Sequence, residues 1–176
     1  PLLSVDRSTL VLNGVSIKMP GRPRSGLDSI GNTAVRVATG GRAPYTYSSN
    51  NSAIASVTAQ GKVVGERNGS ATITVRDASG QSVSYGVQVS NVLQVILDRR
   101  SYNNAAYLAW ARSSGGVFFT AVHWNDLRRV YTRPFDVYTW TGNNNFWHVS
   151  ANWLYGNVPA AAANNVNMNG AVLRPL

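Results

Sequence analysis

The chain has 176 residues, 44% of them hydrophobic, which is enough apolar material for one large or two small packed domains. It contains no cysteine, so disulfides, thiolate metal sites and cysteine nucleophiles are excluded. Residues 1–91 contain nine basic and four acidic residues and carry a charge of +5. Residues 92–176 contain seven basic and three acidic residues and carry a charge of +4. The charge forms no basic stripe, so it indicates a bias toward anionic partners and not a nucleic-acid-binding module.

The first half of the chain, residues 1–91, is a series of short runs in which apolar and polar residues alternate. Turn-forming Gly, Asn and Asp separate the runs, and period-two alternation between turns indicates half-buried strands. Many short strands at regular spacing favour an antiparallel β-sandwich. Residues 2–12 and 15–19 are expected to supply its first strands. The apolar faces of the two clearest predicted strands are Ala71, Ile73 and Val75, and Val83, Tyr85, Val87 and Val89.

Four motifs follow one another in this half. They are Tyr-Thr-Tyr-Ser-Ser-Asn at 45–50, Ile-Ala-Ser-Val at 54–57, Gly-Lys-Val-Val at 61–64 and Asn-Gly-Ser-Ala-Thr-Ile-Thr-Val-Arg-Asp at 68–77. Their order resembles the bacterial immunoglobulin-like group 2 domain over about residues 30–91. The resemblance implies a rigid spacer module of a surface protein, in which the quoted residues form core and turns.

The second half begins with helical patterns. The spacing of apolar residues predicts an amphipathic helix over 103–114, with Asn103 or Asn104 as N-cap and Gly115 in the C-terminal stop. A second, shorter helix is predicted over about 123–131. Helices followed by short β segments are typical of an α+β fold.

The remainder of the second half is rich in aromatic residues and asparagine. Residues 143–153 are interpreted as a loop that enters a strand. Residues 166–173 are interpreted as a closing hairpin, with Asn169 and Gly170 as its turn.

The second half also carries an ordered set of motifs. They are Tyr-Asn-Asn-Ala-Ala at 102–106, Gly-Gly-Val-Phe-Phe-Thr at 115–120, Trp-Asn-Asp-Leu-Arg-Arg-Val-Tyr at 124–131, Trp-Thr-Gly at 140–142, Asn-Phe-Trp-His-Val-Ser at 145–150 and Asn-Met-Asn-Gly-Ala-Val-Leu at 167–173. The set resembles a C-type-lectin-like domain, particularly the terminal domain of the intimin/invasin adhesins. The usual cysteines of that family are missing, so buried tryptophans are expected to hold the loops in place.

A metal or catalytic site has little support in the sequence. Trp-Asn-Asp at 124–126 resembles a calcium-binding motif of sugar-binding lectins, but the acids after residue 91 are only Asp98, Asp126 and Asp136, too few for calcium. Asp126 is expected to cap or solvate a helix. The two histidines, His123 and His148, lack a third ligand at useful spacing. We therefore predict no metal, no cofactor and no enzymatic activity, since no nucleophile motif or phosphate loop is present.

The candidate binding site is the segment rich in asparagine and aromatic residues, together with the arginines before it. Trp and Arg are frequent in binding hot spots, and Asn offers both a hydrogen-bond donor and an acceptor. The alternative is that the tryptophans are core residues and the asparagines only form turns. The candidate residues are Arg128, Arg129, Arg133, Trp140, Asn143, Asn144, Asn145, Trp147, His148, Asn152 and Trp153.

Together, these patterns predict a mostly β protein of two domains. The two resemblances imply that an immunoglobulin-like antiparallel sandwich at residues 1–91 precedes an α+β C-type-lectin-like domain at residues 92–176. The resemblance implies a bacterial surface adhesin whose second domain binds a host-cell receptor, protein or glycan. The expected location is outside the cell, with outer-membrane attachment through an N-terminal anchor that this fragment lacks, and the fragment itself is expected to be a monomer. The alternatives are a carbohydrate-binding lectin module and a phage tail-tip receptor-binding protein.

Overall fold

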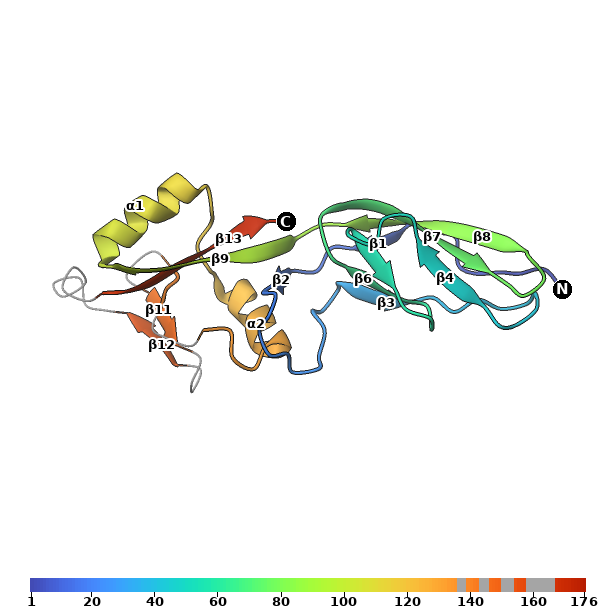
Figure 1. Ribbon diagram of the computed structural model, residues 1–176, viewed down its shortest axis with the longest axis horizontal. Coiled ribbons are helices and arrows are strands. Elements are labelled where there is room, and N and C mark those ends of the chain that lie inside the picture. The colour runs from blue at the N-terminus through green and yellow to red at the C-terminus, as the bar shows by residue number, and fades with distance from the viewer. Residues whose placement is uncertain (136–138, 143–145, 150–153, 158–166) are drawn as a thin grey trace. The chain divides into compact units, whose positions relative to one another are not determined.

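The computed structural model describes residues 1–135, 139–142, 146–149, 154–157 and 167–176, with only the backbone of 146–149 and 154–157 (Figure 1). Its described elements fall into two compact units. Unit 1 comprises Pro1–Ser16, Asp28–Val92 and Leu176. Unit 2 comprises Ile17–Leu27 and Leu93–Pro175.

Unit 1 is built from two sheets of short strands. The sheet with order β1-β8-β7-β4 is antiparallel except where β1 runs parallel to β8. The second sheet has the order β3-β6-β5 and is antiparallel throughout. The strands are β1 (Leu10–Leu12), β3 (Thr33–Val35), β4 (Thr46–Ser49), β5 (Ala55–Val57), β6 (Lys62–Gly65), β7 (Gly69–Arg76) and β8 (Ser82–Val89).

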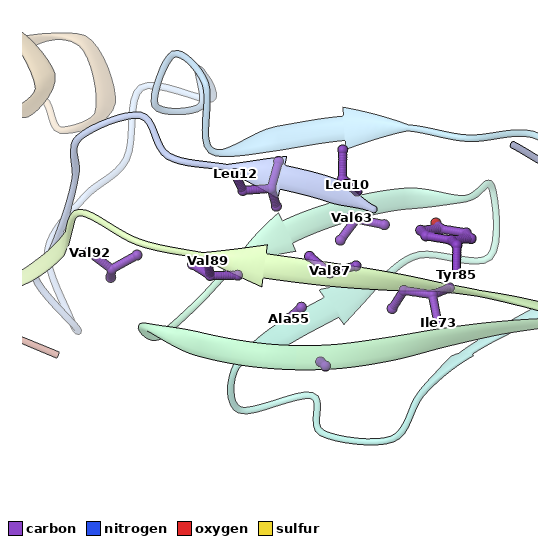
Figure 2. Packing of buried hydrophobic residues seen from close by; sticks show 10 residues of the cluster. Leu10, Leu12, Ala55, Val63, Ile73, Tyr85, Val87, Val89 and Val92 are labelled. Carbon is purple, nitrogen blue, oxygen red and sulfur yellow. The ribbon is translucent and has the colours of Figure 1, made fainter. Parts of the chain in front are cut away.

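The core of unit 1 lies between these sheets (Figure 2). On β7 the alternate residues Ala71, Ile73 and Val75 are buried, because successive side chains of a strand point to opposite faces of its sheet. On β8 the buried residues are Tyr85, Val87 and Val89, whereas Val83 is only partly buried. The predicted sandwich and its two inward-facing strand patterns are therefore confirmed.

Unit 2 contains a mixed sheet with the order β12-β11-β10-β13-β9-β2. The long strand β13 lies between β9, which runs antiparallel to it, and β10, which runs parallel. The strands are β2 (Ser16–Lys18), β9 (Val92–Tyr102), β10 (Thr139–Trp140), β11 (Phe146–Val149), β12 (Leu154–Asn157) and β13 (Met168–Pro175).

The helix α1 (Asn104–Ser114) packs on this sheet (Figure 1). Asn103 caps it by accepting a hydrogen bond from the Ala106 N–H at 2.9 Å, and Gly115 ends it with a φ of 69°. Both predicted helix signals are confirmed. Tyr107 points from α1 into the core, where its hydroxyl donates to the Ala171 carbonyl of β13.

The predicted closing hairpin at 166–173 is wrong, because residues 168–175 form the single strand β13. Asn169 and Gly170 lie inside this strand, and the pairing register shifts between Met168 and Gly170. A Cβ at Gly170 would lie 3.0 Å from the Tyr107 ring and 3.1 Å from the Trp110 ring. This glycine therefore allows α1 to pack closely on the sheet and does not form a turn.

The structure also differs from the predicted division of the chain at residues 17–27. Residues 15–19 were expected to supply a strand of the sandwich, and all of residues 1–91 were expected to belong to it, but β2 joins the sheet of unit 2 instead. The physical reason is a set of hydrogen bonds that join residues 17–27 to groups more than 100 positions away in the sequence.

Candidate functional site

Residues 17–27 cross unit 2 beside the second helix, α2 (Ala121–Val130), and we call them the strap. At its start the Ile17 N–H donates to Asp126 Oδ2 at 2.7 Å. The buried Tyr131 hydroxyl accepts from the Met19 N–H at 2.8 Å and donates to the Ile17 carbonyl at 3.0 Å. Burial raises the pKa of Tyr131, so its hydroxyl keeps the proton that it donates.

The end of the strap lies against the C-terminal end of α2 (Figure 1). Ser25 donates from its backbone N–H to the Val130 carbonyl at 2.8 Å and from its hydroxyl to the Arg129 carbonyl at 2.5 Å. The Thr132 N–H in turn donates to the Pro23 carbonyl at 3.1 Å. Carbonyls in the last turn of a helix lack partners within the helix, and the strap satisfies two of them.

The start of α2 is fixed by a histidine. The Thr120 backbone N–H donates to Nδ1 of His123 at 3.0 Å, so His123 takes the place that Glu or Gln has in a capping box. Burial lowers the pKa of His123, which favours the neutral ring needed to accept this bond. A cluster of rings from Phe119, Trp124 and Phe135, with centroids 4.9–5.9 Å apart, packs beside this end.

This arrangement gathers five arginines, which we call the arginine surface. The strap contributes two of them, and Arg24 lies over the Tyr131 ring with its Cζ 5.7 Å from the ring centroid. The last turn of α2 contributes two more, where a positive charge is favourable near the carbonyl end of the helix dipole. All are exposed except Arg22, which is half-buried. The members are Arg22, Arg24, Arg128, Arg129 and Arg133.

The strap changes the distribution of charge between the two parts of the protein. Unit 1 carries six basic and four acidic residues, a net charge of +2. Unit 2 carries ten basic and three acidic residues, a net charge of +7. The nearly equal charges of the two sequence halves thus become strongly unequal in the fold, since Lys18, Arg22 and Arg24 belong with unit 2.

Trp140 has to be removed from the candidate contact residues. Its side chain is fully buried, and its Nε1 donates to the Tyr102 carbonyl at 2.8 Å. Its ring stacks near Tyr107, with centroids 6.4 Å apart. A side chain with no exposed surface and a satisfied N–H supports the core of unit 2 and does not contact a partner.

The other candidate contact residues lie in different parts of the chain, and the structure describes only some of them. Arg128, Arg129 and Arg133 are brought together and exposed. Trp147 and His148 belong to β11, where their backbones pair with Gly156 and Tyr155 of β12. The remaining candidates, Asn143, Asn144, Asn145, Asn152 and Trp153, lie outside the described residues.

Asp126 corrects a further expectation. It is buried and binds the Ile17 N–H, so it holds the strap and does not solvate or cap a helix. Across the described ranges, no group of three or more His, Cys, Asp or Glu side chains is placed to hold a metal ion. Among the described helices, none has the length and apolar character of a membrane span.

Sequence reasoning missed Arg22 and Arg24, which it left in the sandwich. Residues 20–26 do contain two prolines and two glycines, which break the period-two pattern before and after them. That break lies within the strap, after the chain has left unit 1 at Ser16. Nothing in the local pattern indicates which distant residues the strap meets.

Similarity to known proteins covers both units. The family model of the intimin immunoglobulin-like domain matches residues 29–79, within unit 1. Intimin of Citrobacter freundii is 38% identical over 80 residues, which are 44% of this chain. The chain spans only 8% of the length of that relative.

Two solved structures match the chain along nearly its whole length. A crystal structure of an intimin mutant from EHEC O157:H7 has a TM-score of 0.52 and 16% identity, and the match covers 99% of each chain. The C-terminal 282-residue fragment of intimin, crystallised with the intimin-binding domain of the translocated intimin receptor (Tir), has a TM-score of 0.53 and 18% identity. That match covers 98% of this chain and 66% of the fragment.

At this level of identity the two structures establish the fold. The predicted order, an immunoglobulin-like sandwich followed by an α+β lectin-like domain, is confirmed. Residues 29–79 therefore match the intimin immunoglobulin-like domain, and the chain as a whole has the two-part fold of intimin C-terminal fragments.

Proposed function

We propose that this chain is the receptor-facing end of a bacterial surface adhesin, in which unit 2 binds a host-cell receptor protein and unit 1 is a rigid spacer. The observation that carries the proposal is the match of 98% of the chain to an intimin fragment that was crystallised with the intimin-binding domain of Tir. The 38% identity to intimin over 80 residues supports the same class of protein. The complete protein is then expected at the bacterial surface, attached to the outer membrane.

The proposed contact residues are the exposed arginines Arg128, Arg129 and Arg133 together with the segment 143–153. Guanidinium groups bind carboxylates and other oxyanions through two parallel hydrogen bonds, and asparagine side chains pair with peptide groups. Trp140 is not among them, because it is buried. A spacer role for unit 1 agrees with its continuous apolar core between two sheets.

The recognition that we propose needs no metal ion. The affinity comes from arginine, asparagine and aromatic side chains, so binding is expected to persist in EDTA. Loss of binding in EDTA, restored by calcium, would contradict this part of the proposal.

The test measures binding of fluorescently labelled chain to cultured epithelial cells and, by biolayer interferometry, to the purified intimin-binding domain of Tir. Saturable binding to either target supports an adhesin. The matched pair of variants is Asn143→Ala with Asn144→Ala, against Asn51→Ala with Gln60→Ala on the exposed surface of unit 1. Weaker binding of the first pair alone supports recognition by unit 2.

Two outcomes would contradict the proposal. The absence of saturable binding to cells and to the Tir domain would remove the adhesin function. Equal loss of binding in both pairs of variants would remove the assignment of recognition to unit 2.

A further inference from the structure

The arginine surface exists only in the folded protein. Arg24 and Arg129 are 105 positions apart in the sequence, yet the strap is bonded to the backbone of α2 at Arg129 and Val130. The two basic segments therefore lie side by side in unit 2, the unit that carries a net charge of +7. A surface of one sign attracts oppositely charged ligands and raises their rate of association.

The chemistry of this surface favours oxyanions. All five of its cations are guanidinium groups, and a guanidinium presents a planar fork of N–H donors that matches sulfate and carboxylate oxygens.

The surface offers charge in place of apolar anchors. The large apolar side chains at this end of α2 face inward, since Val130, Tyr131 and Phe135 are each no more than 2% exposed. Leu27 is exposed at the end of the strap, but leucine is seldom a binding hot spot. Protein partners are usually anchored by aromatic side chains in apolar pockets, whereas polyanions bind mainly through charge.

We infer that the arginine surface binds a sulfated polysaccharide chain of the host-cell surface. Repeated sulfate and carboxylate groups along such a chain fit guanidinium groups presented by two neighbouring segments, the strap and the end of α2. The inference rests on the proposed function for its host-cell setting. It adds a second ligand of unit 2, which would compete with the receptor protein for Arg128, Arg129 and Arg133.

The test uses the full chain and a size-defined heparin oligosaccharide as the probe, with binding measured by fluorescence anisotropy at about 0.15 M salt. In the surface variant Arg128, Arg129 and Arg133 are replaced by Gln. In the matched control the exposed Arg42, Arg67 and Arg76 of unit 1 are replaced by Gln, so both variants lose three positive charges. We expect affinity to fall roughly tenfold or more in the surface variant and about twofold in the control, because salt screens distant charges.

The single variant Arg24→Gln tests the contribution of the strap. It should weaken heparin binding severalfold and lower the melting temperature of the chain only slightly, because Arg24 contacts the Tyr131 ring but is exposed. A melting temperature measured for every variant separates lost contacts from lost folding. The variant in which Arg128, Arg129 and Arg133 become Lys keeps the charge but loses the planar fork, so its affinity should lie between those of the unchanged chain and the Gln variant.

Three results would overturn the inference. The first is an absence of heparin binding at that salt concentration. The second is an equal loss of affinity in the surface variant and the control, which would indicate net charge alone. The third is equally tight binding of a polyglutamate peptide that also depends on Arg128, Arg129 and Arg133, which would indicate an acidic protein partner. Binding to the Tir domain is a separate measurement, so failure here leaves the proposed function standing.

Discussion

The two units differ in how far apart in the sequence their partners lie. In unit 1 the strands β7 and β8 pair along their whole length and are joined by a short turn. In unit 2 the edge strand β2 comes from the other end of the chain, and its Ile17 N–H binds Asp126 across a separation of 109 residues. The alternation of apolar and polar residues therefore predicts the strands of unit 1 well. The fold of unit 2 depends on contacts between residues far apart in the sequence, which no local pattern indicates.

The two units also differ in net charge. Unit 1 has a net charge of +2 and unit 2 has +7, although the two halves of the sequence have +5 and +4. The strap carries three basic residues and no acidic one from the first half of the sequence into the second unit. A count by sequence halves consequently conceals where an anionic partner would bind.

The largest effect is expected from Trp140→Ala in the core of unit 2. The side chain is fully buried, so its removal leaves a cavity that costs about 3–5 kcal/mol of unfolding free energy. All five tryptophans of the chain lie between residues 110 and 153, so tryptophan fluorescence during denaturation reports on unit 2 alone. The midpoint of that transition should fall strongly.

The matched variant in unit 1 is Ile73→Ala, which removes a fully buried side chain from the sandwich. It should lower the stability of the sandwich, followed by the backbone amide signals of β7 and β8 in NMR spectra, and leave the fluorescence transition in place. A fluorescence transition that shifts equally in both variants would mean that the units unfold together, and the comparison between them would fail.

A smaller effect is expected from Asp126→Ala, which removes the acceptor for the Ile17 N–H. An unsatisfied buried donor costs about 1–3 kcal/mol, and the fluorescence transition of unit 2 should move accordingly. Asp126→Asn keeps an acceptor oxygen at the same place and should cost less. Equal stability of the two variants would show that the strap is not held through this bond.

Much of the fold could be predicted from the sequence. The alternation of Ala71, Ile73 and Val75 identifies an inward-facing strand, because period two is the geometry of the strand itself. Asn103 and Gly115 bound α1 correctly, because capping also acts between near neighbours.

The predictions that were wrong depend on packing and burial, which residues far apart in the sequence determine. Asn-Gly at 169–170 is a strong turn signal, but the packing of α1 on β13 decided the role of Gly170. Trp140 was placed at the binding site because aromatic residues are common in both cores and interfaces, and only its burial separates the two. The arginine surface was predicted in part, through Arg128, Arg129 and Arg133, whereas Arg22 and Arg24 reach it through the strap.

The substitution Gly170→Ala adds one methyl group and tests how closely α1 packs on β13 in unit 2. The new Cβ would lie 3.0 Å from the Tyr107 ring, so the ring or the helix has to shift, at a cost of about 1–2 kcal/mol. Its counterpart in unit 1 is Gly86→Ala on β8, where the nearest atom is 4.0 Å from the new Cβ. That substitution should be neutral or slightly stabilising. Thermal denaturation of both variants checks the pair, and an equal loss would contradict the tight packing of α1.

The smallest effect is a pH dependence of unit 2 that comes from His123. The pKa of this histidine is lowered from its ordinary value of 6.5 by burial, so the folded ring binds fewer protons near pH 6 than the unfolded one. Stability from the neutral ring is present above pH 6.5 and is lost as the pH falls below it, because a protonated Nδ1 cannot accept from the Thr120 N–H. Stability measured by tryptophan fluorescence should therefore decrease between pH 7 and pH 5, by less than about 1 kcal/mol.

His123→Gln tests this assignment, since glutamine is a normal partner in a capping box and does not titrate. The variant should keep most of its stability at pH 7 and lose the pH dependence between pH 7 and pH 5. Asp77 and Asp98 are poor alternative causes in this range, because hydrogen bonds lower the pKa of each below the ordinary value of 3.8. His148→Gln is the control, because His148 is the only other histidine of the chain. If the pH dependence persists in His123→Gln and disappears in His148→Gln, the sensitive group lies on β11 and the cap of α2 does not respond to pH.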